Sequence, residues 1–251
     1  MLRTIQATRY VTPLKEGGSL PAIVEADDLG LYVVKFRGAG QGPLALVAEI
    51  VAGEIGRALG LSIPEIVLAE VDEALGRNEP DPEIYDLLKA SIGLNVAMDF
   101  LPGSVMFDPA AGDAPGAEVA SRAVWFDAFV SNVDRTPRNA NILCWHRKMY
   151  FIDHGAALYF HHNWQTIEQM ARSPFRPVRD HILLRWASRL EETDAALRPL
   201  LNEDLFTRVM NLVPEDWLQQ SRQDYVAYFL QRLNSASIFV EEALRARAEL
   251  V

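Results

Sequence analysis

The segment NVDRTPRNAN, residues 132–141, is a polar decapeptide set between apolar segments of a 251-residue chain. An apolar helical pattern ends at residue 130, and an apolar strand pattern begins at residue 142. Within the decapeptide, Asp134 and Asn139 are separated by four residues, and Pro137 disfavours a continuous helix. Polar groups bounded by buried segments are expected to project into a cleft. The pattern therefore predicts a functional loop.

The spacing of Asp134 and Asn139 is that of the kinase catalytic loop, where the aspartate handles the acceptor hydroxyl and the asparagine holds a magnesium ion. Asn141 directly precedes the strand and is an alternative metal ligand; the spacing favours Asn139. Fourteen residues after Asn139, an apolar strand ends in Asp153-His154-Gly155. This Asp-x-Gly pattern predicts a second metal ligand, Asp153, with Gly155 allowing a sharp turn that aims the carboxylate at the metal.

Two charged residues upstream complete the pattern. Lys35 lies in an apolar strand pattern over residues 31–36, as the phosphate-pairing lysine of kinases does. A helical pattern follows over residues 44–59, and Glu49 lies near its start. There it is expected to form an ion pair with Lys35 and fix its position. The order Lys, Glu, Asp-x4-Asn, Asp-x-Gly predicts a phosphoryl-transfer centre of Lys35, Glu49, Asp134, Asn139 and Asp153.

The remaining patterns divide the chain into a β-rich part and a helical part. Strand patterns occupy residues 2–14, 22–26, 31–36, 65–71 and 94–101, and turn residues punctuate them. From residue 117 onward helices dominate, apart from an expected hairpin over residues 142–145 and 149–152. Residues 72–92 suggest a surface insertion with a short helix over 84–90. Residues 103–117, rich in Ala, Gly, Pro and Asp, suggest a linker.

The expected architecture is an α+β, bilobal, protein-kinase-like fold. A β-rich N-terminal lobe with one main helix would occupy residues 1–101. A helical C-terminal lobe over residues 102–251 would carry the catalytic loop 132–141 and Asp153. A hinge near residues 98–103 would join the two.

The loop and the helix exit carry a resemblance to one family. Residues 132–139, reading Asn-x-Asp-x-x-x-Arg-Asn, resemble the catalytic loop of HipA-like serine/threonine kinases. Glu49 and the segment ALGLSIP, residues 58–64, resemble the helix and its exit in that family. The Asp-Arg opening at Asp134 is also similar to that of phosphoinositide kinases. The resemblance implies a small member with the kinase domain alone, without the N-terminal domain of full HipA toxins.

The resemblance implies a phosphotransferase that uses ATP and magnesium, with Asp134 as catalytic aspartate and Asn139 and Asp153 as magnesium ligands. Lys35, held by Glu49, would bind the ATP phosphates. The other residues expected at the nucleotide are the phosphate loop Gly17, Gly18 and Ser19 and the adenine hinge Met98, Asp99, Phe100 and Leu101. The sequence lacks Gly-x-Gly-x-x-Gly, and His154 replaces the Phe of Asp-Phe-Gly. The acceptor stays open: protein, lipid head group or small molecule.

Composition argues against several other classes. The net charge of −10 disfavours binding to a nucleic-acid backbone, and no apolar run is long enough for a membrane span. The single cysteine, Cys144, fits a reducing cytoplasm. No metalloprotease or Gly-x-Ser-x-Gly motif supports zinc or serine-hydrolase chemistry. The alternative that remains is a nucleotide-binding pseudokinase or interaction module that transfers no phosphate.

Overall fold

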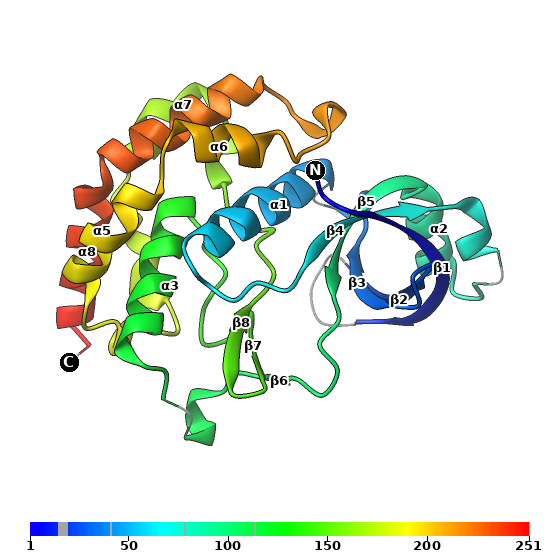
Figure 1. Cartoon of the computed structure of the whole chain (residues 1–251), viewed down its shortest axis with the longest axis horizontal. Helices are drawn as coiled ribbons and strands as arrows, with labels where there is room; N and C mark the ends of the chain where they lie inside the picture. Colours follow the sequence, from blue (N-terminus) through cyan, green and yellow to red (C-terminus); the bar gives the residue numbers. More distant parts are fainter. Residues whose placement is uncertain (15–19, 41, 78, 113, 251) are drawn as a thin grey trace.

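The computed structural model describes residues 1–14, 20–40, 42–77, 79–112 and 114–250. The N-terminal part is a β-barrel with one long helix beside it, and the C-terminal part is mainly helical (Figure 1). This mixture confirms the predicted α+β class. The predicted phosphate loop, Gly17, Gly18 and Ser19, lies outside the described residues.

Five strands close into a barrel in the order β1-β2-β3-β5-β4. Their bounds are β1 (Thr4–Pro13), β2 (Ala22–Ala26), β3 (Leu31–Lys35), β4 (Ile66–Val71) and β5 (Gly93–Asp99). The strands β1 and β4 run parallel and close the barrel. Register shifts after Ala7 and after Tyr10 let β1 bend, so residues 4–6 pair with β4 and later residues pair with β2. The sequence predicted the strands but not this closure.

The alternation of β3 decides where Lys35 points. Tyr32 and Val34 are buried in the barrel core, so Val33 and Lys35 lie on the opposite face of the strand. That face is turned toward α1 (Gly42–Ala58). The predicted functional lysine is therefore outside the barrel interior and only partly exposed.

Helix α1 ends in a Schellman motif and joins the two parts of the molecule. Gly60, at φ 81°, donates to the Arg57 carbonyl, and Leu61 donates to the Gly56 carbonyl, each at 3.0 Å. The apolar residues of α1 belong to the core that also holds the C-terminal helices, whereas the barrel has a smaller core of its own. Figure 1 shows α6 (Glu203–Met210) beside α1, and the two helices are in contact.

The acidic insertion between β4 and β5 contains two short helices, η1 (Glu73–Gly76) and α2 (Pro82–Ala90). Helix α2 begins two residues earlier than predicted, because the Asp81 side chain caps it and Pro82 occupies its first turn. Both elements lie against the barrel (Figure 1).

The segment after β5 holds a small second sheet. The predicted hairpin is present as β7 (Ile142–Trp145) and β8 (Lys148–Phe151). A two-residue strand, β6 (Val105–Met106), pairs with β7 and makes the order β6-β7-β8. With η2 (Pro109–Ala111), β6 gives local structure to the segment that the sequence indicated only as a linker.

Helices form most of the remainder. Helix α3 (Ala117–Val130) is the buried centre, and its Trp125 and Phe129 pack against rings from the last helices. No helix in the described ranges is long and apolar enough to cross a membrane. The elements after β8 are η3 (Tyr159–His162), η4 (Trp164–Thr166), α4 (Ile167–Ala171), η5 (Arg176–Asp180), η6 (Leu184–Trp186), α5 (Leu190–Leu197), η7 (Arg198–Leu200), α6, η8 (Glu215–Trp217), α7 (Arg222–Asn234) and α8 (Ala236–Ala248).

Candidate functional site

The ammonium group of Lys35 joins three elements. Its Nζ lies 2.7 Å from Oε2 of Glu49 on α1 and 2.6 Å from Oδ1 of Asp153, just after β8. Glu49 is almost completely buried, whereas 45% of the Asp153 side chain is exposed. The ion pair between Lys35 and Glu49 that the sequence predicted is therefore present. Asp153 keeps an exposed surface through which it could meet a ligand.

The charges of this triad do not balance. Burial opposes the charge of Lys35, but Glu49 and Asp153 raise its pKa to about 12. Burial raises the pKa of Glu49, against the lowering effect of Lys35. Burial also opposes ionisation of Asp153, yet the nearby ammonium holds its pKa below the usual range. One ammonium thus faces two carboxylates.

Asp134 and both candidate asparagines meet in one place. The Asn139 amide donates to Asp134 Oδ2 at 2.7 Å, and the Asn141 amide donates to the same oxygen at 3.4 Å. Burial and the negative charge of Asp153 raise the pKa of Asp134, while the two amides oppose that shift. The structure therefore brings the predicted residues together, and it leaves either asparagine within reach of a shared ligand.

The backbone around these residues is held in an uncommon conformation. Asn141 has φ 49° and Asp153 has φ 55°, both in the left-handed region that non-glycine residues rarely adopt. Gly155 does lie in a turn, in which Ala157 donates to the His154 carbonyl at 2.9 Å, but its φ is not positive and a Cβ there would meet only ordinary contacts, so this turn does not require glycine. The positive φ lies at Asp153. A residue stays in such a conformation only when the contacts around it hold the backbone there. Residues of this kind are common at functional sites.

A buried cluster that the sequence did not predict holds the loop in place. Arg135 and Asp127 on α3 form a fully buried ion pair, and His181 Nε2 lies 2.9 Å from the same Asp127 oxygen. The guanidinium of Arg135 also donates to the backbone oxygens of Asn141 and Ile152. One side chain thereby links the loop of residues 132–141 to the strand end before Asp153.

One signal in the sequence could have found this cluster. Asp127 is the only charged residue in the apolar run of residues 123–130. A carboxylate inside such a run is costly to bury and predicts a buried cationic partner. The fold was needed to identify Arg135 as that partner and to bring His181, 54 residues away, to the same carboxylate.

A second buried guanidinium fixes the end of α3. Arg232 on α7 donates to the carbonyls of Ala128 and Phe129 in the last turn of α3. It also donates to the carbonyl of Ala171, the last residue of α4, and to that of Ser173. Burial lowers its pKa to about 10. A cation at helix C-termini satisfies unpaired carbonyls and complements the helix dipole. Arg232 therefore anchors the helix that leads into the predicted catalytic loop.

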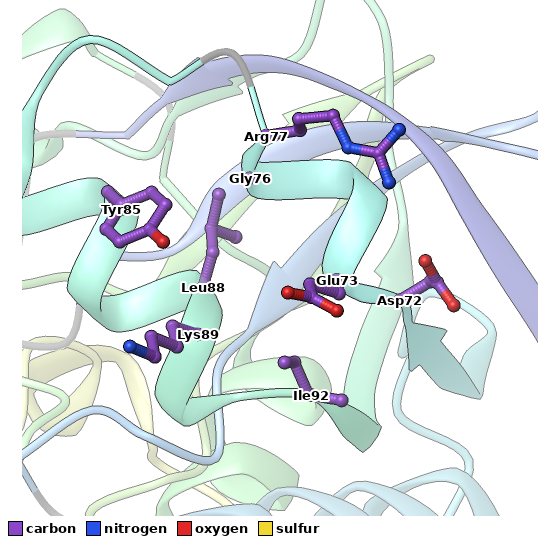
Figure 2. A pocket seen from close by; sticks show the side chains of 8 residues that line it. All are labelled: Asp72, Glu73, Gly76, Arg77, Tyr85, Leu88, Lys89 and Ile92. Atoms are coloured by element: carbon purple, nitrogen blue, oxygen red, sulfur yellow. The ribbon is translucent and has the colours of Figure 1, made fainter.

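The expected hinge residues end the barrel. Met98 and Leu101 are buried, Phe100 is half-buried and Asp99 is exposed. The chain then crosses to β6 (Figure 1). A separate small hollow of about 180 Å³ lies between η1 and α2, where Figure 2 shows Glu73, Arg77 and Lys89 at its edge. None of the residues of the phosphoryl-transfer centre lines that hollow.

Comparisons with known proteins point to one family. The model of the family described as HipA-like kinase matches residues 8–242. The Helicobacter pylori proinflammatory kinase CtkA has a similar fold, with a TM-score of 0.57 and 13% identity, over 100% of this chain and 99% of that chain. The Golgi casein kinase bound to Mn/ADP also has a similar fold, with a TM-score of 0.54 and 12% identity. The match covers 96% of this chain and 73% of that chain. No curated protein sequence matches significantly.

Proposed function

The chain belongs to the HipA-like kinase family, and on that premise we propose that it is an ATP- and magnesium-dependent phosphotransferase with a hydroxyl acceptor. The observation that carries the proposal is the position of Lys35, in contact with Glu49 and Asp153 at once. Asp134 lies in the same site. Phosphoryl transfer needs a positioned cation, a metal-binding carboxylate and a carboxylate for the acceptor hydroxyl, and these residues supply all three.

We assign residues 1–101 and 102–251 to two lobes that hold the nucleotide between them. The adenine would lie at the hinge Met98, Asp99, Phe100 and Leu101, where the chain leaves the barrel for β6 (Figure 1). Lys35 would then point at the phosphates from the barrel side. The phosphate loop at Gly17, Gly18 and Ser19 remains a prediction from the sequence.

The oxygen donors present suit magnesium. Asp153 offers a carboxylate, and Asn139 or Asn141 offers an amide oxygen, because the amide nitrogen of each is directed at Asp134. No group of three His, Cys, Asp or Glu side chains converges within the described ranges. Magnesium usually takes one or two carboxylates with substrate phosphates and water. The structure of the Golgi casein kinase with Mn/ADP supports the use of a nucleotide and a divalent metal by this fold.

When bound, a magnesium ion would supply positive charge against the nucleotide phosphates and the carboxylates of the cleft. Lys35 stays protonated at neutral pH and offsets charge on the transferred group. Asp134 accepts or orients the proton of the acceptor hydroxyl, and its raised pKa favours proton uptake. Arg135 keeps the loop of Asp134 and the backbone before Asp153 in fixed relation.

The proposal is tested with ATP radiolabelled on its γ-phosphate. Purified protein should transfer label to itself or to a lysate component only when magnesium is present, and Lys35→Met should abolish the transfer. The alternative is a pseudokinase or interaction module. Binding of magnesium and ATP with no hydrolysis and no transfer to any fraction would favour that alternative and contradict the proposed activity.

A further inference from the structure

A groove of about 1040 Å³ lies between the β7–β8 hairpin, the start of α3 and the loop after α1. None of the residues of the phosphoryl-transfer centre lines it. Its volume is at the upper end of the roughly 300–1,000 Å³ typical of small-molecule sites, so it has room for several side chains. The apolar residues of its wall include Leu61, Phe107, Val119, Met149 and Phe151.

The strand register explains why this wall is apolar. Phe151 is paired with Ile142, and Phe107 donates its N–H to the Ile142 carbonyl; these three side chains are buried. Val105, Cys144 and Met149 are each two residues away from Phe107, Ile142 and Phe151 and are paired across the sheet. They therefore lie on the same face as those three residues, because cross-strand partners share a face. Val105 is 63% exposed. One face of the sheet therefore continues from the core out to solvent as an apolar surface.

Cationic side chains border this apolar surface. Arg147 and Lys148 line the groove and are exposed, and neither forms an ion pair with any described carboxylate. Glu118 and Arg122 also line the groove and form an ion pair with each other, and Arg122 donates to the Leu59 carbonyl. The whole chain carries a net charge of −10. Arg147 and Lys148 therefore form a positively charged edge of the groove on a protein whose net charge is negative. This edge is complementary in charge to an acidic ligand.

The hairpin turn itself does not account for these cations. His146 and Arg147 form the two-residue turn, at φ 46° and φ 62°. Turns of this length with positive φ at both positions favour Asn and Gly, and other residues cost about 1–2 kcal/mol each. Local backbone preference would select against arginine here. The backbone preference of the turn therefore gives no reason for an arginine at this position.

We propose that this groove docks an acidic, apolar segment of a partner protein. Its carboxylates would meet Arg147 and Lys148, and its apolar side chains would pack on Val119 and Met149. A segment bound there lies outside the phosphoryl-transfer centre, so binding needs neither nucleotide nor metal. The docking proposal consequently stands or fails independently of the proposed activity.

A random dodecapeptide library displayed on phage, selected on the full chain without nucleotide, tests the proposal. Enriched peptides should combine Asp or Glu with Leu, Ile or Phe. Their affinity, measured by fluorescence anisotropy, should fall at least about tenfold in Arg147→Glu/Lys148→Glu. The matched control Arg77→Glu/Lys89→Glu makes the same charge change at the hollow of Figure 2 and should leave the affinity unchanged.

Two further measurements separate the proposal from folding defects and from plain charge attraction. Peptides with Asp and Glu changed to Lys should bind Arg147→Glu/Lys148→Glu better than wild type, which a misfolded variant could not do. Val119→Arg removes an apolar contact but adds a positive charge, so it should weaken binding. Stronger binding to Val119→Arg, equal binding to both charge-reversed variants, or binding of phosphatidylserine vesicles in place of peptides would overturn the proposal.

Discussion

Arg135 Nε lies 2.5 Å from Asp127 Oδ2, and neither side chain has any exposed surface. Asp127 belongs to α3, and Arg135 directly follows Asp134. The same guanidinium donates to the backbone oxygens of Asn141 and Ile152. The segments that carry Asp134 and Asp153 are therefore tied to one buried ion pair. The geometry of the candidate site depends on a pair of residues that would never touch substrate.

Asp127→Asn keeps the shape of the side chain but leaves Arg135 buried without its anion. Breaking a buried ion pair on one side costs about 3–5 kcal/mol, so urea unfolding should show a loss of that size. Glu192→Gln, which breaks the exposed pair with Arg189, is the control and should cost less than about 1 kcal/mol. An equally small loss for Asp127→Asn would mean that backbone carbonyls alone satisfy Arg135.

Asp153→Ala should cost nucleotide binding. The substitution removes a partly exposed oxygen donor, while Lys35 keeps its contact with Glu49 and the fold persists. Isothermal titration with ATP and magnesium should show affinity lowered at least about tenfold, because loss of a charged contact costs about 2 kcal/mol or more. Asp86→Ala, at an exposed carboxylate of α2, should bind as wild type does. Full magnesium-dependent turnover in Asp153→Ala would contradict its assignment.

Asp134→Asn should cost chemistry and not binding. It preserves shape and polarity but removes the carboxylate that we propose accepts or orients the acceptor proton. Turnover should fall by about two to four orders of magnitude, while ATP affinity stays within a few-fold. Unchanged turnover would favour the non-catalytic module. A large loss of affinity would show instead that Asp134 is among the metal ligands.

Lys35 and Glu49 should be energetically coupled. Lys35→Met leaves Glu49 buried without its cation and should destabilise the protein. Adding Glu49→Gln should recover part of that loss, because the uncompensated charge is removed. A double-mutant cycle by urea unfolding should give a coupling energy of about 0.5–3 kcal/mol. Simple additivity of the two losses would show that the observed contact contributes nothing to stability.

His161 should make stability depend on pH. Burial, and secondly the neighbouring His162, lowers its pKa to about 3. The unfolded chain, with a histidine pKa of about 6.5, binds more protons between these values, so stability falls as pH falls through that window. In the wild-type protein, His161 should lower the free energy of unfolding by about 2 kcal/mol at about pH 5 relative to pH 7. Urea unfolding of His161→Phe should show that this loss is gone. His146→Phe, at an exposed position, should retain the wild-type dependence.

The local patterns of the sequence predicted much of the candidate site. The order of charged residues typical of kinases predicted an ion pair between Lys35 in a strand and Glu49 near the start of the next helix, and the structure contains that pair. The spacing of Asp134 and Asn139 and the strand end at Asp153 are also local features, and these residues converge in the structure. Their catalytic and metal-binding roles remain predictions. The sequence could predict this much because periodicity and short spacings depend on neighbouring residues.

What only the tertiary structure decided involves residues far apart in the chain. Closure of the barrel needs residues 4–6 to pair with β4, and no local pattern encodes that register. Asp127 meets His181 across 54 residues, and Arg232 meets Ala128 across 104. The positive φ of Asp153, next to the Ile152 carbonyl that accepts from Arg135, was not predicted from the sequence either. The sequence determined which charged and polar groups were present and how they were spaced. The packing of distant segments decided which of these groups are buried together, because a buried charge is costly unless an opposite charge or a hydrogen-bond partner lies beside it.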